Sequence, residues 1–220
     1  MLSSTTEDYL KVIWALSEWS EDPVTIGSLA RSLGLAPSSV SETIKRLASQ
    51  GLVDHEPYRG IRLSERGEAA AVTMIRRHRV LETYLVRVFG YTWDEVHDEA
   101  EALEHGASNR LIDAMASALG NPAVDPHGDP IPRADGSLPE CPEHVISLAE
   151  LAPGRAAEIV RVSDAAPELL RWCEKSGLTL GAQVRVTDVI AAAQLLEVAV
   201  ATAPEPLTLS LAAAGSIWVR

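Results

Sequence analysis

Residues 25–50 read TIGSLARSLGLAPSSVSETIKRLASQ, and this stretch decides the fold expected for the first third of the chain. Thr25 can cap a short helix that ends at Gly34, and Pro37 suits the first turn of a second helix that stops at Gly51. Two short helices joined by a few residues that include a glycine form a helix-turn-helix. The pattern therefore predicts this motif, with its second helix beginning near Pro37.

The segments on either side extend the motif. Upstream, residues 4–7 have the spacing of a capping box and precede an apolar stripe, which predicts a helix from about Thr5 to Glu18. Downstream, residues 52–55, a turn at 58–60 and residues 61–63 predict a two-stranded hairpin. This order predicts a winged helix-turn-helix over residues 1–72.

Such a motif places its second helix in the major groove of DNA, where the amino-terminal side chains reach base edges. Short polar groups can make those contacts, and here they are Ser38, Ser39, Ser41, Glu42 and Thr43. Basic groups hold phosphates instead, and the candidates are Lys45, Arg46, Arg59 and Arg62. The alternative is that the serines only cap and solvate the helix.

A second informative stretch, VHDEAEALEHGAS, covers residues 96–108. At 100° per residue, four of its side chains project from about one third of a helix circumference: His97, Glu101, Glu104 and His105. His78 and Glu82 have the same helical spacing upstream. Imidazole and carboxylate donors without thiolate suit a divalent ion such as Mn²⁺ or Fe²⁺. A solvated acidic helix face is the simpler alternative.

Four segments in order resemble the DtxR/MntR family of metal-dependent transcriptional repressors: the winged helix, RRHRVLE (76–82), VHDEAEALEH (96–105) and DPHGDPIP (125–132). The resemblance covers essentially the whole chain and is closest to three-domain, manganese-responsive members. It implies a primary metal site formed by Asp8, Glu101, Glu104 and His105. It also implies an ancillary site that contains His78, Glu82 and His97.

Ligand chemistry separates the branches of this family. Iron-responsive relatives have methionine at the position of Asp8 and cysteine at that of Glu101, so both soft donors are replaced here by oxygen. We therefore expect Mn²⁺ as the effector, with Fe²⁺ as the alternative. Short manganese sensors have a glutamate where this chain has Lys11, and a charged lysine cannot ligate a second ion there.

The resemblance also implies that residues of the proline-rich loop and the third domain join the ancillary site. The matching positions are Asp125, His127 and Asp164. The alternative for residues 125–129 is a turn tied by local side-chain hydrogen bonds.

The net charge of −12 argues against nucleic-acid binding, because a basic face is usual in such proteins. Its distribution reduces the conflict. Residues 1–90 carry eleven Lys/Arg and eleven Asp/Glu, whereas residues 91–220 carry eight and twenty. The acidity therefore lies mostly outside the predicted DNA-binding domain, and divalent cations would neutralise part of it.

The remaining patterns predict two further domains in an α+β chain. A helix from Ser64 to before Gly90 and another from Thr92 to about Leu119 predict a helical domain over residues 73–142, ending in a proline-rich loop. In the family this domain binds metal and forms the homodimer interface. Residues 143–220 are expected to form a small SH3-like β-barrel, from short strands near 158–162, 183–186, 195–200 and 207–211 and a helix over 167–175.

These patterns predict a homodimeric, manganese-dependent repressor that binds operator DNA and controls metal-uptake genes. The sequence has neither a secretory signal nor an apolar run of about eighteen residues, so we expect a cytoplasmic protein without a membrane segment. Two other classes are weighed against this one. A carboxylate-bridged metallohydrolase is disfavoured because no HExxH, Ser/His/Asp or P-loop signature is present, and a winged-helix regulator of an organic ligand would bind no metal.

Overall fold

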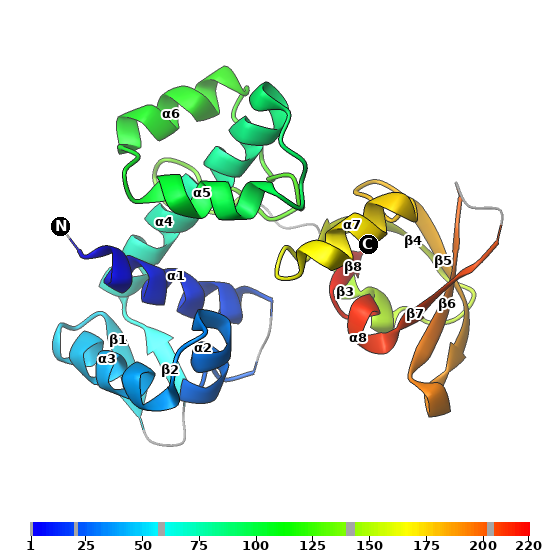
Figure 1. Cartoon of the computed structure of the whole chain (residues 1–220), viewed down its shortest axis with the longest axis horizontal. Helices are drawn as coiled ribbons and strands as arrows, with labels where there is room; N and C mark the ends of the chain where they lie inside the picture. The colour runs from blue at the N-terminus through cyan, green and yellow to red at the C-terminus, as the bar shows by residue number, and fades with distance from the viewer. Residues whose placement is uncertain (1, 20–21, 57–59, 140–143, 202–204) are drawn as a thin grey trace.

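The computed structural model describes residues 2–19, 22–56, 60–139, 144–201 and 205–220. The chain has three parts in sequence order: a winged helix-turn-helix, a helical domain and a C-terminal β domain (Figure 1). The predicted α+β architecture is therefore confirmed. Along the described chain, no helix combines the length and apolarity needed to cross a membrane.

The winged helix-turn-helix consists of three helices and a hairpin: α1 (Ser4–Glu18), α2 (Ile26–Leu33), α3 (Pro37–Ser49), β1 (Val53–Glu56) and β2 (Gly60–Leu63). Thr25 and Ser28 form a reciprocal capping box on α2, and Gly34 ends that helix in a left-handed conformation (φ 64°). The first helix begins one residue earlier than predicted, because the hydroxyl of Ser3 accepts from the backbone N–H of Thr6. The predicted turn residues Tyr58 and Arg59 lie outside the described residues.

The long helix α4 (Glu65–Tyr84) connects the first two parts. Its first half packs Ala71, Val72 and Ile75 into the core of the winged helix, and its second half packs Val80 and Leu81 into the helical domain. The predicted boundary after residue 72 thus falls inside one continuous helix. The predicted boundary after residue 142 lies outside the described residues.

After α4 the chain continues as a π-helical segment, Leu85–Phe89, which the sequence pattern did not predict, and Gly90 ends it with φ 75°. The single helix predicted from Thr92 to about Leu119 is wrong. Two helices are present instead, α5 (Val96–Glu104) and α6 (Asn109–Ala118). Ser108 caps α6 by accepting from the backbone N–H of Leu111, so a new helix begins where the earlier one stops.

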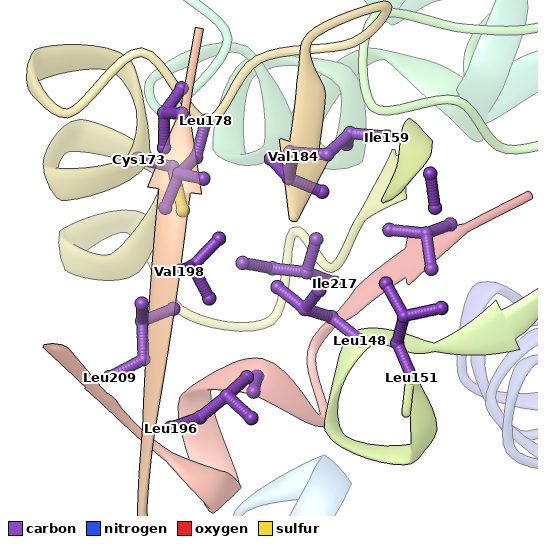
Figure 2. Close-up of a cluster of buried hydrophobic side chains, with 14 of the residues drawn as sticks. Leu148, Leu151, Ile159, Cys173, Leu178, Val184, Leu196, Val198, Leu209 and Ile217 are labelled. Atoms are coloured by element: carbon purple, nitrogen blue, oxygen red, sulfur yellow. The ribbon is translucent and has the colours of Figure 1, made fainter. Parts of the chain in front are cut away.

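The C-terminal domain is built on a six-stranded sheet in the order β3-β8-β4-β5-β6-β7, all of whose neighbours are antiparallel. The strands are β3 (Ile146–Ser147), β4 (Ala156–Val162), β5 (Gln183–Ile190), β6 (Leu195–Val200), β7 (Leu207–Ser210) and β8 (Ile217–Val219). The described part of the domain also contains two α-helices, α7 (Pro167–Lys175) and α8 (Leu211–Ala214), and two short 3-10 helices, Leu148–Glu150 and Ala191–Ala193. Its apolar core includes Ile159, Val198 and Ile217, which lie between the sheet and the helices (Figure 2).

The predicted strands and the helix at 167–175 are present, but two short strands, β3 and β8, were not predicted. Each has three residues or fewer, too few for an alternating pattern to stand out. The sheet has β3 and β7 at its edges and does not close among the described residues. The small β domain is therefore present as predicted, but its described strands form an open sheet rather than a closed barrel.

A cluster of aromatic and charged side chains fastens the C-terminal domain to the end of α1. The guanidinium of Arg161 lies between Trp19 and Trp218, with its carbon 4.5 and 4.0 Å from the two ring centroids. Asp129 of the proline-rich loop accepts from Nε of Arg161 at 2.6 Å and from the indole N–H of Trp19 at 3.0 Å. The contact therefore joins α1, the loop and β4, and we call these four residues the interdomain clasp.

We predict that Gly67→Ala destabilises the protein by about 3 kcal/mol, because overpacking a close backbone contact forces a shift. A Cβ at Gly67 would lie 1.9 Å from the carbonyl oxygen of Leu52, where α4 crosses the start of the wing. Gly27→Ala is the matched control on α2, since its Cβ would meet only Thr25 Oγ1 at 3.7 Å. It should gain up to about 1 kcal/mol from helix propensity. Urea denaturation measures both, and equal stability of Gly67→Ala and wild type would contradict the packing argument.

Candidate metal centre

Seven of the candidate ligands lie in two neighbouring clusters. The primary cluster comprises Asp8, Glu104 and His105, and the ancillary cluster comprises His78, Glu82, His97 and Asp164. Within each cluster, one potential ligand atom per residue lies within 4.8 Å of all the others. Tertiary structure brings these atoms together, because they come from α1, α4, α5, the residue after α5 and the connection between β4 and α7.

The primary cluster joins α1 to the end of α5. Nε2 of His105 lies 2.8 Å from Oδ1 of Asp8, and its Nδ1 lies 2.9 Å from Oε2 of Glu7. Nε2 of His105 is also 3.9 Å from Oε1 of Glu104. Glu7 is a residue that the sequence interpretation missed, since residues 4–7 were assigned to helix capping. As a partner of the second imidazole nitrogen, it fixes the orientation of the ring.

The fourth predicted member of the primary site, Glu101, is placed differently. Its side chain is 47% exposed, and Oε1 accepts from the ammonium of Lys11 at 2.6 Å. The same ammonium donates to Oε1 of Glu104 at 2.5 Å. Glu101 groups with His78 and Glu104 rather than with Asp8 and His105. The sequence interpretation thus placed Lys11 near the site but not between its carboxylates.

The ancillary cluster surrounds the fully buried carboxylate of Glu82. Oε1 of Glu82 lies 3.0 Å from Nε2 of His78 and 3.4 Å from Nδ1 of His97. Nδ1 of His97 is 3.1 Å from Oδ2 of Asp164, which comes from the C-terminal domain. Asp164 thus lies in the ancillary cluster, although it follows the other members of the cluster by more than sixty residues.

The residues of the ancillary cluster fit a bound divalent ion. Both carboxylate oxygens of Glu82 and Nδ1 of His127 are buried without a hydrogen bond among the described residues, although charged groups lie close to them. Burial of a carboxylate without hydrogen bonds is costly. A metal ion among these oxygen and nitrogen atoms would satisfy them, and oxygen with imidazole is the donor set of Mn²⁺ and Fe²⁺.

The proline-rich loop supports this cluster from one side. His127 is fully buried, with Nε2 2.7 Å from the carbonyl oxygen of Trp93 and Nδ1 3.7 Å from Oε2 of Glu82. Oδ1 of Asp125 accepts from the backbone N–H groups of His127 and Asp129, which is the local turn considered above as the alternative to ligation. Glu82, Asp125 and His127 nevertheless form a further group of potential ligands.

Three imidazoles of the centre, those of His78, His97 and His127, have raised pKa values that favour their protonated forms. Burial lowers the pKa of His78, but Glu82 and Glu104 outweigh it and raise the pKa to about 9. Burial likewise opposes the effects of Asp164 and Glu82 on His97, whose pKa rises to about 10. Burial lowers the pKa of His127 as well, but the facing carboxylate of Glu82 outweighs it and the pKa rises to about 10.

Three carboxylates, those of Glu82, Glu104 and Asp164, have lowered pKa values, whereas burial raises the pKa of Asp8 and of Asp125. Burial raises the pKa of Glu82, yet the charge of His78 and the neighbouring imidazoles hold it well below its usual range. Burial raises the pKa of Asp164, but the hydrogen bond with His97 outweighs it and lowers this pKa to about 2. The pKa of Glu104 is lowered, since His78 and Lys11 outweigh its burial. The metal-free centre is thus a network of charged pairs.

The predicted DNA-contacting residues divide by position on α3. Val40, Ile44 and Leu47 are buried against the rest of the winged helix, so the opposite face is free. Exposed on it or on the wing are Ser38, Ser39, Glu42, Lys45, Arg46 and Arg62. Ser41 and Thr43 are half-buried, and Arg59 lies outside the described residues.

Comparison with known proteins assigns the family. The model of the iron-dependent repressor N-terminal DNA-binding domain matches residues 1–61, that of the iron-dependent repressor metal-binding and dimerisation domain matches 64–133, and the FeoA domain matches 146–220. The iron-dependent repressor IdeR of Mycobacterium bovis is 34% identical over 164 residues, covering 72% of this chain and 71% of that protein. The chain belongs to the iron-dependent repressor family. It is a metal-dependent DNA-binding repressor and not an enzyme.

Solved structures of this family are similar along the whole chain. A manganese-dependent transcriptional repressor in complex with manganese is 45% identical, with a TM-score of 0.91 and coverage of 97% of this chain and 98% of that one. The manganese regulator SloR is 30% identical, with a TM-score of 0.83 and 98% of this chain covered, as is 98% of SloR. The three-part arrangement of this repressor is therefore the arrangement of these relatives.

We predict that Mn²⁺ binding at pH 7 releases protons and tightens as the pH rises, because imidazoles must lose a proton to ligate. The raised pKa values of His78, His97 and His127 mean that these imidazoles are fully protonated below pH 6.5. They lose their protons as the pH rises through about 9 to 10. Calorimetric titration in buffers of different ionisation enthalpy measures the release. His97→Ala should reduce it and His55→Ala, on the exposed wing, should not. A binding enthalpy independent of the buffer would contradict the prediction.

Proposed function

We propose that this repressor responds to Mn²⁺, binds operator DNA as a homodimer and controls genes of metal uptake in the cytoplasm, where operator DNA lies. One observation carries the proposal: Asp8 on α1 of the DNA-binding domain lies 2.8 Å from His105 at the end of α5 in the helical domain. A site that contains Asp8, Glu104 and His105 therefore joins the two domains, with Glu101 as an exposed neighbour. A bound cation would supply electrostatic attraction between them.

The contact between the DNA-binding domain and the helical domain affects DNA recognition. Two recognition helices must match two half-sites separated by one or more turns of DNA. The relation of each α3 to the dimer depends on how α1 is held against α5. Asp8 and His105 form one of the contacts between them, beside those that Glu7 and Lys11 make. Ligand binding that favours one arrangement of the domains shifts the population towards it. The residues of the primary cluster thus provide the link between metal concentration and DNA affinity.

Manganese is favoured over iron by the donors. The primary cluster offers carboxylate and imidazole without sulfur, and hard oxygen ligands suit Mn²⁺. The structural relatives named for manganese support this choice, while the curated relatives named for iron make Fe²⁺ the second candidate. The ancillary cluster, with Asp125 and His127 beside it, is proposed as a second site that strengthens the response.

Exposed apolar side chains support the homodimer. In the helical domain, Val96 and Ile112 are buried in the chain itself, whereas Leu103 and Leu111 remain 42% and 47% exposed. Phe89, at the end of the π-helical segment, is 66% exposed. Such groups are common in interfaces between subunits.

The effector is tested with a DNA duplex that the protein itself selects from a random library in the presence of Mn²⁺. Binding should be strong in Mn²⁺, at least as strong as in Fe²⁺ without oxygen, and absent in chelator, because a filled cluster stabilises the arrangement of the two domains that matches the operator. Gel shift across metal concentrations provides the measurement. Equal affinity in chelator and in Mn²⁺ would overturn the proposed sensor, and a preference for Fe²⁺ would select the alternative effector.

The roles of the two clusters are tested by paired variants. Glu104→Ala should abolish Mn²⁺-dependent DNA binding while leaving a dimer in sedimentation, because Glu104 belongs to the joint between the domains. His97→Ala, in the ancillary cluster, should raise the Mn²⁺ concentration needed by about 10-fold. Asp98→Ala, an exposed acid on the same helix, is the control and should behave as wild type. If His97→Ala is the more severely impaired, the assignment of primary and ancillary roles is wrong.

A further inference from the structure

Lys11 is a buried cation inside the proposed metal centre. Its residue is only 7% exposed, and its ammonium donates to Glu101 at 2.6 Å and to Glu104 at 2.5 Å. Lysine is rarely buried to this extent unless it is paired. Here both partners are carboxylates that face the ligands of the primary cluster, so the ammonium occupies a position in which positive charge is stabilised.

The atoms show that Lys11 and a metal ion would share an acceptor. Oε1 of Glu104 accepts from Lys11 and is also the oxygen that lies 3.9 Å from Nε2 of His105 in the primary cluster. The other oxygen, Oε2, is 2.6 Å from Nδ1 of His78. Neither oxygen of Glu104 is therefore free, and a metal ion that recruits this carboxylate must do so against a positive charge already held there.

Charge gives the direction of the effect. Asp8, Glu101 and Glu104 would repel one another in the metal-free protein, and Glu104 is completely buried. Lys11 offsets part of this repulsion, which stabilises the empty site. The same positive charge disfavours a divalent ion a few ångströms away, because like charges at that separation repel strongly in a partly buried environment.

We propose that Lys11 is a built-in competitor of the metal: it pairs with Glu101 and Glu104 when the primary cluster is empty and thereby sets the metal concentration at which that cluster fills. The inference rests on the proposed function, since it concerns the same cluster. Lys11 is a positioning and threshold-setting residue rather than a ligand, because a charged ammonium has no lone pair to donate.

The test compares Lys11→Met, which keeps the length of the apolar stem, with Lys11→Arg, which keeps the charge. Both are made in a chain that carries His97→Ala, so that binding at the ancillary cluster does not obscure the primary one. Calorimetry with Mn²⁺ should show at least about tenfold tighter binding in Lys11→Met, and little change in Lys11→Arg. Lys175→Met, an exposed lysine of α7, is the control for the loss of one positive charge and should bind like its parent.

Thermal denaturation supplies a second readout. The Tm of metal-free Lys11→Met should fall by about 5 °C or more, since Glu104 loses a buried partner, and saturating Mn²⁺ should raise it by more than it raises the Tm of the parent. If the variant is unfolded without metal, recovery of its native circular dichroism at Mn²⁺ concentrations below those that half-saturate the parent supports the proposal, and failure to recover overturns it.

Three results of the Mn²⁺ titration would overturn the proposed competition between Lys11 and the metal. Mn²⁺ binding that is no tighter in Lys11→Met than in its parent excludes it, and tightening of the same size in Lys11→Arg shows that charge is not the cause. If neither wild type nor the parent chain, which carries His97→Ala alone, binds Mn²⁺ at the primary cluster, the proposed function fails together with this inference. The first two results leave the proposed function intact.

Discussion

The structure depends on the neutralisation of two fully buried carboxylates, Glu82 and Glu104. Burial of an unpaired charge is too costly to persist, so both must be surrounded by positive groups. Those groups come from four separate segments: Lys11 on α1, His78 on α4, His97 on α5 and His127 in the proline-rich loop. The electrostatic requirement at the centre therefore fixes how these segments meet.

His78 couples the two clusters that form around these carboxylates. Its Nδ1 faces Glu104, while its Nε2 faces Glu82 at 3.0 Å and His97 at 3.2 Å. An imidazole that ligates through one nitrogen and donates through the other has its tautomer and orientation fixed by both neighbours. The two clusters are thus in direct contact through one imidazole ring.

The C-terminal domain is tied to the rest of the chain at two places with different chemistry. Asp164 contributes a carboxylate to the ancillary cluster, and the interdomain clasp packs Arg161 between Trp19 and Trp218. The proline-rich loop runs between them, where Gly128 (φ 93°) is required because a Cβ there would lie 2.1 Å from the carbonyl oxygen of Val160. The contact of Asp164 with the ancillary cluster and the interdomain clasp therefore both hold the same β domain against the rest of the chain.

The sequence by itself determined the local elements and the chemistry of the donors. Capping residues and apolar spacing are short-range signals, so α2, α3, the wing and α7 were predictable, as were the oxygen and imidazole donors on α4 and α5. Tertiary structure alone decided the short strands β3 and β8 and the partners of Lys11, Glu7 and Arg161, because each depends on segments far apart in sequence. Spacing along a helix placed Glu101 among the ligands, but only packing against α1 paired it with an ammonium instead.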